Sequence, residues 1–222
     1  MAISGQPHRS GWPDIIFSEK AIFLTLLNTT VPRILGACFY YPPHSDGVQR
    51  LILTLPELAD LFPWPDADAV RKACSSIHQI DPESLVYDYS ILFEGQGVMP
   101  APPWSSVYLE RENLLMGEST LAYRDFLASQ GMVTDTQNPE PDDHFGLMLM
   151  AFAYLIEADK PESAARLISE YLLPWAERYL ELVKQTETEQ PFYPVLADVA
   201  TVYLSRLKEQ MNLQVSPAVL HL

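Results

Sequence analysis

The feature that most constrains this chain is the helical spacing of its apolar residues, which recurs in segment after segment without strand-like alternation. From Phe145 to Ile156 the apolar side chains point nearly all round a helical axis, as in a central, buried helix. Pro161, Pro174 and Pro194 each stand where a further helix would begin, in a first turn that tolerates proline. We therefore predict an all-α protein, a single globular helical domain of about eight to eleven helices.

Segments that cannot be helical divide the chain. Residues 1–17 contain Gly, Pro and Ser and are predicted to form an irregular N-terminal arm, so that the helical domain covers residues 18–222. A helix is expected to start at Glu19, with Ser18 as its cap. Residues 131–141 are polar with two prolines and are the best hinge candidate. Such a hinge allows two chains to exchange halves, so both a monomer and a dimer remain open.

The charge of the chain bears on its partners. Fourteen Lys and Arg stand against 29 Asp and Glu, which gives a formal net charge of −15. This charge repels phosphate backbones and anionic lipid headgroups, so nucleic acid is not expected as a partner. It favours a cationic partner, because attraction at long range raises the encounter rate. The alternative is that the acidity only keeps the protein in solution.

Nothing in the sequence indicates export or membrane insertion. The N-terminus lacks a basic segment followed by an uninterrupted apolar one, so we expect no secretory signal. The most apolar segment, residues 22–41, is broken by Pro32 and Arg33 and is not expected to span a membrane. Cys38 and Cys74 are too few for a disulfide framework and are expected to be buried thiols. The sequence thus predicts a cytoplasmic protein without an integral membrane segment.

The common catalytic motifs are missing from the sequence. It contains no phosphate-binding loop of the Gly-x-x-x-x-Gly-Lys type and no Gly-x-Ser-x-Gly elbow. The five histidines do not have the spacing of a zinc site. We therefore predict a protein that is not an enzyme and that has no catalytic residues, no metal site and no cofactor.

Two stretches stand out as candidates for binding. The first is YDYSILFEGQGVMPAPPWSSVYLERE. In it, a helix with Tyr89 and Phe93 leads into a proline-rich loop that contains Pro103 and Trp104 and is followed by Tyr108. Aromatic side chains on a semi-rigid loop offer a large contact area with little rotamer entropy to lose, which suits peptide recognition. The alternative is that these aromatic residues only fill a helical core.

The second stretch, NPEPDDHFG, contains Glu140, Asp142, Asp143 and His144 at the start of a helix. We expect Asp142 or Asp143 to cap this helix. Capping accounts for one carboxylate, whereas the whole cluster could bind a guanidinium group through charge-assisted hydrogen bonds. His144 could orient a carboxylate or contribute a pH-dependent charge. The alternative is a satisfied cap beside a solvated acidic edge.

At these two stretches the chain resembles the TorD/DmsD family of redox-enzyme maturation chaperones, and it resembles the DmsD branch most. The matching motifs are RILGACFYYPP, PAPPWSSVYLERE, EPDDHFG and LLPWAERYLE, in this order. The resemblance implies an all-helical protein that binds the twin-arginine signal peptide (the leader) of a molybdoenzyme in the cytoplasm. It would hold a catalytic subunit of the dimethyl sulfoxide reductase type until the molybdopterin cofactor is inserted. The Tat translocase is a further candidate partner.

The family's leader-binding surface, together with the acidic cluster, gives the predicted peptide-binding residues of this chain. They are Tyr40, Tyr89, Leu92, Phe93, Pro103, Trp104, Tyr108, Glu140, Asp142, Asp143 and His144. Tyr89 stands where close relatives often have Trp, and the N-terminal arm is longer than the family usually shows. We expect the apolar part of the leader to pack on the aromatic residues while its arginines meet the carboxylates.

Three other readings remain open at this point. The client could be trimethylamine N-oxide reductase, nitrate reductase or another molybdoenzyme served by a sibling chaperone. The chain could instead bind guanine nucleotide, as has been proposed for the family, although no phosphate-binding loop is present. A helical scaffold that binds a folded partner is the third alternative.

Overall fold

The computed structural model describes residues 28–77, 79–95, 98–113, 115–132 and 140–222. The expected N-terminal arm, the helix expected from Glu19 and most of the expected hinge lie outside these residues. Within them the α-helices are α2 (Thr30–Tyr40), α3 (Asp46–Thr54), α4 (Ala67–Ser76), α5 (Pro82–Phe93), α6 (Ser105–Leu109), α7 (Glu118–Ser129), α8 (Phe145–Glu157), α9 (Pro161–Arg166), α10 (Leu173–Gln185) and α11 (Phe192–Gln210). A 3-10 helix, η1 (Leu55–Asp60), follows α3, and a π-helical turn, η2 (Leu167–Leu172), joins α9 to α10.

The described residues form helices and no strand, which confirms the predicted all-α class. The predicted range of eight to eleven helices is also confirmed, whether α9 and α10 are counted apart or as one helix joined by η2. None of these helices combines the length and the apolar character that a membrane span requires.

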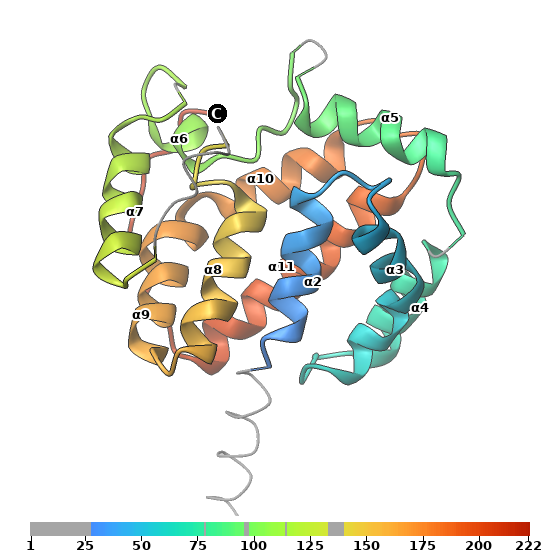
Figure 1. The fold of residues 1–222 in the computed structure, drawn as a ribbon, viewed down its shortest axis with the longest axis horizontal. Helices are drawn as coiled ribbons and strands as arrows, with labels where there is room; N and C mark the ends of the chain where they lie inside the picture. Colours follow the sequence, from blue (N-terminus) through green and yellow to red (C-terminus); the bar gives the residue numbers. More distant parts are fainter. Residues whose placement is uncertain (1–27, 78, 96–97, 114, 133–139) are drawn as a thin grey trace, which may run out of the picture.

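The centre of the molecule is the antiparallel pair α2 and α8, which lie side by side (Figure 1). Arg33 at the start of α2 pairs with Glu157 at the end of α8, and the Tyr40 ring at the other end contacts His144. In Figure 1, α7 and α9 lie on one side of this pair and α3 and α4 on the other, while α10 and α11 pack on each other.

Two glycines allow α2 and α8 to approach closely. A Cβ atom on Gly36 would lie 2.6 Å from the carbonyl oxygen of Gly146, and a Cβ on Gly146 would lie 2.5 Å from that of Gly36. Both distances are shorter than real contacts allow, and both partners are backbone atoms that cannot rotate away. The sequence therefore permits this crossing only because neither residue has a side chain.

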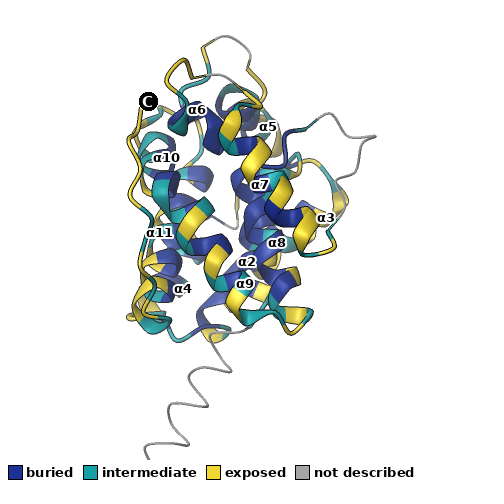
Figure 2. Cartoon of the chain, turned by 90° about the vertical axis from the view of Figure 1, so that its left-hand side faces the viewer, coloured by how far each residue is buried: buried dark blue, intermediate teal, exposed yellow. Residues whose placement is uncertain are grey.

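The predicted central helix is confirmed. Most residues of α8 are buried, including Phe145, Met148, Phe152 and Leu155, and Figure 2 shows the buried faces of the helices turned toward the interior. Cys38 and Cys74 are also buried, as expected, and burial raises the pKa of their thiols to about 12 and about 11.

Candidate functional site

Helix α5 places the first group of predicted residues. Asp81 accepts a hydrogen bond from the Ser84 amide (2.8 Å) and Pro82 occupies the first turn, so the sequence begins this helix at a defined position. The rings of Tyr89 and Phe93 lie one turn apart, with centroids separated by 5.4 Å. A buried carboxylate, Asp88, holds the other side of α5 by accepting hydrogen bonds from the amides of residues 189 and 190.

The two stretches that stand out in the sequence meet in the structure. Phe145 donates its amide hydrogen to the carbonyl oxygen of Pro103 (2.7 Å), and Ser105 donates to that of Asp143 (3.1 Å). These bonds make a short antiparallel bridge in which Trp104 lies opposite His144. The proline-rich loop and the start of α8 are thereby held together as one unit.

Trp104 is fixed by contacts on both ends of its indole. Its ring nitrogen donates to Glu140 Oε1 (2.6 Å), and its ring lies edge-on to His144 with centroids 6.2 Å apart. The side chain is partly exposed, although it also packs against the core. Burial raises the pKa of the Glu140 carboxyl, while the hydrogen bond from Trp104 opposes this shift. The partly exposed indole of Trp104 is therefore fixed in position at the end of the proline-rich loop.

Tyr40 extends this aromatic surface onto α2, and the buried Tyr89 of α5 lies beside it. The Tyr40 ring lies perpendicular to His144 at 5.1 Å, and the Tyr89 hydroxyl donates to the carbonyl oxygen of Tyr40 (2.8 Å). We call Tyr40, Tyr89, Trp104 and His144 the aromatic cluster. It joins α2, α5, the proline-rich loop and the start of α8, which are far apart in the sequence.

His144 is the cap of α8, and the expectation that Asp142 or Asp143 would cap this helix is wrong. Its Nδ1 atom accepts a hydrogen bond from the Gly146 amide (3.0 Å), which leaves the ring proton on Nε2. Burial lowers the pKa of His144 to about 3. The imidazole is thus neutral at physiological pH. His144 therefore does not contribute a pH-dependent charge at physiological pH.

The two aspartates have separate internal partners. Asp143 is fully buried, and its Oδ2 atom accepts from the Ser105 hydroxyl (3.0 Å) and the Ser106 amide (2.8 Å), so it holds the start of α6. Asp142 forms an ion pair with Arg124 of α7. The aspartates keep internal partners because α6 and α7 lie against the start of α8, an arrangement that capping rules do not predict.

Eight of the eleven predicted peptide-binding residues are buried, namely Tyr89, Leu92, Phe93, Pro103, Tyr108, Asp142, Asp143 and His144. Leu92 is fully buried, and Phe93 packs its ring against Phe39 and Tyr193. Tyr108 is also fully buried and packs on Trp175 with ring centroids 5.2 Å apart. Tyr40, Trp104 and Glu140 are the predicted residues with partly exposed side chains.

The sequence reasoning missed Arg124, Ser105 and Ser106. Ser105 and Ser106 directly follow Trp104, and the helix-start preference of serine was a usable signal for them. Arg124 lies 18 residues before its partner Asp142, in a separate helix, so no local pattern indicates this pair.

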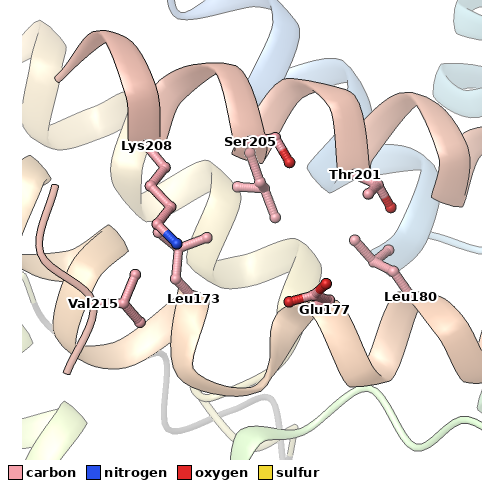
Figure 3. A pocket seen from close by; sticks show the side chains of 8 residues that line it. Leu173, Glu177, Leu180, Thr201, Ser205, Lys208 and Val215 are labelled. Carbon is pink, nitrogen blue, oxygen red and sulfur yellow. The ribbon is translucent and has the colours of Figure 1, made fainter. Parts of the chain in front are cut away.

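A hollow of about 260 Å³ lies apart from the aromatic cluster, between α10, α11 and the C-terminal tail (Figure 3). Figure 3 shows side chains from the two helices pointing into it from opposite sides. Its lining residues are Leu173, Glu177, Leu180, Thr201, Leu204, Ser205, Lys208 and Val215. None of the predicted peptide-binding residues belongs to it. Among the residues that the structure describes, no group of three or more His, Cys, Asp or Glu could hold a metal ion.

Comparison with known proteins places this site in context. The family model described as nitrate reductase delta subunit matches residues 55–181. The protein named Tat proofreading chaperone DmsD from Salmonella typhimurium is 35% identical over 185 residues, which cover 83% of this chain and 90% of that protein. The protein named chaperone protein TorD from Psychrobacter sp. is 25% identical over 167 residues, which cover 69% of this chain and 76% of that protein.

A solved structure shows a similar fold. It is described as a redox enzyme maturation protein from Archaeoglobus fulgidus and aligns with a TM-score of 0.52 at 18% identity. The alignment covers 81% of this chain and 93% of that one. At this identity the likeness concerns the fold and not the client.

Proposed function

The chain belongs to the nitrate reductase delta subunit family, together with relatives named as DmsD and TorD chaperones, and from this membership we propose that it is a Tat proofreading chaperone. Its task is to bind the twin-arginine leader of a redox enzyme during maturation. The named relatives are chaperones and not catalysts, and the sequence motifs agree with a binding protein.

The observation that best supports a leader-binding site is the fixed, partly exposed indole of Trp104 within the aromatic cluster. The Glu140 hydrogen bond and the bridge to His144 order this side chain before any peptide arrives. Preordering reduces the entropy that binding would otherwise cost. The apolar part of the leader packs on Trp104 and Tyr40, and the interior residues Leu92, Phe93 and Tyr108 support them.

The finer assignments rest on the resemblance to the DmsD branch. The client is a molybdoenzyme catalytic subunit of the dimethyl sulfoxide reductase type, bound in the cytoplasm before export by the Tat translocase. A sibling client such as trimethylamine N-oxide or nitrate reductase is the alternative. Pull-down from anaerobically grown cells, followed by identification of the leader-bearing protein, distinguishes these clients.

Calorimetric titration of the protein with a synthetic dimethyl sulfoxide reductase leader tests the proposal. We expect saturable one-to-one binding that weakens moderately at higher salt. A matched peptide with two lysines in place of the arginines should bind more weakly, because lysine cannot make the two-pronged pair with a carboxylate. If the folded protein binds none of the dimethyl sulfoxide, trimethylamine N-oxide and nitrate reductase leaders, the proposal is wrong.

A further inference from the structure

The ion pair between Arg124 and Asp142 places a guanidinium group of this chain at the acidic cluster. Arg124 Nε, from α7, donates to Asp142 Oδ2 at the start of α8. The Asp142 side chain is 11% exposed and the Arg124 side chain 34% exposed. The carboxylate is therefore largely shielded from water, while the guanidinium that neutralises it still reaches the surface.

The surroundings of this pair contain more acceptor capacity than Arg124 uses. Asp143 Oδ1 is buried, and no donor among the described residues reaches it. The Tyr123 hydroxyl is also buried without a hydrogen-bond partner among those residues. Burial raises the pKa of Tyr123, and the negative charges of Asp142 and Asp143 raise it further.

The pair also adjoins the aromatic cluster. Asp142 and Asp143 directly precede His144, which lies opposite Trp104 in the antiparallel bridge. Glu140, two residues before Asp142, accepts the hydrogen bond from the Trp104 indole. A peptide whose apolar part packs on Trp104 therefore has its neighbouring residues close to Asp142.

We propose that Asp142 is the receptor for an arginine of the leader, and that Arg124 occupies this receptor as an internal substitute until the leader displaces it. The inference rests on the proposed function and adds a mechanism of exchange to it. The arriving guanidinium replaces a group of the same kind, so Asp142 is neutralised before and after the exchange.

The exchange has a consequence for α7. Arg124 links α7 to the segment that precedes α8, and its displacement removes this link. The start of α7 keeps a separate anchor, because Glu110 Oε1 accepts hydrogen bonds from the Ser119 amide and hydroxyl, both at 2.7 Å. Leader binding should thus loosen the middle of α7 while its first turn stays in place.

Arg124→Gln tests the competition, with calorimetric titration of the leader as the measurement. Loss of the competing guanidinium should tighten leader binding by about twofold to fivefold, within the range that corresponds to a partly exposed ion pair. Arg71→Gln, which breaks the exposed Arg71–Asp60 pair on α4 and η1, is the matched control and should leave the affinity unchanged. The double variant Arg124→Gln, Asp142→Asn should lose the gain.

The outcomes separate this inference from the proposed function. If wild-type protein binds the leader but Arg124→Gln binds it equally or more weakly, Arg124 is a structural residue and the inference fails. If wild-type protein does not bind any leader, the proposed function itself fails. Should Arg124→Gln not fold, Arg124→Lys replaces it, and a smaller tightening is then expected because lysine makes a single-point pair.

Hydrogen exchange on the wild-type protein gives a second readout. Amides in the middle of α7 should exchange faster when the leader is bound, while amides of α8 should not. Unchanged or slower exchange in α7 in the presence of a saturating leader would overturn the displacement of Arg124.

Discussion

The indole of Trp104, which we propose as a contact for the leader, is held in place by several interactions. Its indole nitrogen is held by Glu140, its backbone lies opposite His144, and the preceding Pro103 accepts from Phe145. Residues 140–145 thus fix one partly exposed ring, so we expect a peptide to gain its apolar contact without having to order it.

Trp104→Ala should weaken leader binding more than any single acidic substitution at moderate salt. Loss of a large apolar contact worth roughly 1.5–3 kcal/mol corresponds to about a tenfold to hundredfold weaker affinity. Calorimetric titration measures the change, and Tyr87→Ala, on the exposed side of α5, is the matched aromatic control. An equal or larger loss from Asp143→Ala in a folded protein would reverse this ranking.

A second prediction for a single residue concerns His144 and the dependence of protein stability on pH. In the unfolded chain a histidine takes up a proton below a pKa of about 6.5, whereas burial lowers the pKa of folded His144 to about 3. The unfolded state therefore binds the extra proton between these values, so the stability due to His144 is complete above pH 6.5 and decreases as the pH falls.

From pH 7 to pH 5 this histidine should lower the free energy of unfolding by about 2 kcal/mol. His144→Asn removes the titrating group, while asparagine can still accept the amide hydrogen bond of a helix cap. Urea unfolding measures the free energy of unfolding of both proteins at pH 7 and pH 5. The decrease in this free energy from pH 7 to pH 5 should be smaller in the variant by this amount. Between pH 7 and pH 8 the difference between them should stay constant, and equal decreases from pH 7 to pH 5 would contradict the assignment.

At the scale of elements, the crossing of α2 and α8 sets the geometry of the site. The end of α2 places Tyr40 against His144, and Gly146 lies under this contact, since a Cβ on Gly146 would approach the Tyr40 Cβ to 2.9 Å. Separation of these helices therefore changes the stability and the aromatic cluster together.

Gly146→Ala should destabilise the protein by about 1–3 kcal/mol, because the added methyl group meets backbone atoms in a packed interior. Leader binding should weaken as well, since Tyr40 must move. Thermal unfolding and titration measure the two effects. Gly47→Ala in α3 is the matched control, because no atom lies within 4 Å of its added Cβ, and its stability should be unchanged or slightly higher. Equal effects of the two substitutions would refute the tight crossing.

At the scale of the whole molecule, the net charge of −15 acts over a longer range than any single contact. The acidic residues near the proposed site, Asp142 and Asp143, already have internal partners, so we expect much of the attraction for a cationic leader to come from the field of the whole protein. This field steers the encounter more than it holds the complex.

Raising the salt from about 0.05 M to about 0.5 M should therefore slow leader association severalfold and change dissociation little. Stopped-flow fluorescence of a labelled leader separates the two rates. A salt effect mainly on dissociation would show that close ion pairs dominate the affinity instead.

The sequence leaves open whether the chain is a monomer or a dimer that exchanges halves through residues 131–141. Size-exclusion chromatography with light scattering distinguishes the two states.

Periodicity was enough to predict the all-α class and the buried helix α8, because helix formation and amphipathicity depend on residues three or four positions apart. The same local reasoning selected Trp104 and the acidic stretch by their residue types. It also selected Tyr108 as a contact residue, and the family resemblance added Leu92, whereas the packed structure places both in the interior.

Only the tertiary structure determines which partner each of these polar residues contacts. Asp143 accepts hydrogen bonds from the start of α6 rather than capping α8. His144 caps α8, and Arg124 forms an ion pair with Asp142. The Asp143 and Asp142 contacts join residues 37 and 18 positions apart, and they exist because α6, α7 and α8 pack together. Local sequence determines which helices form and which face of each is apolar. The partner of a buried charge depends on which helices meet, and that is settled by packing of the whole chain.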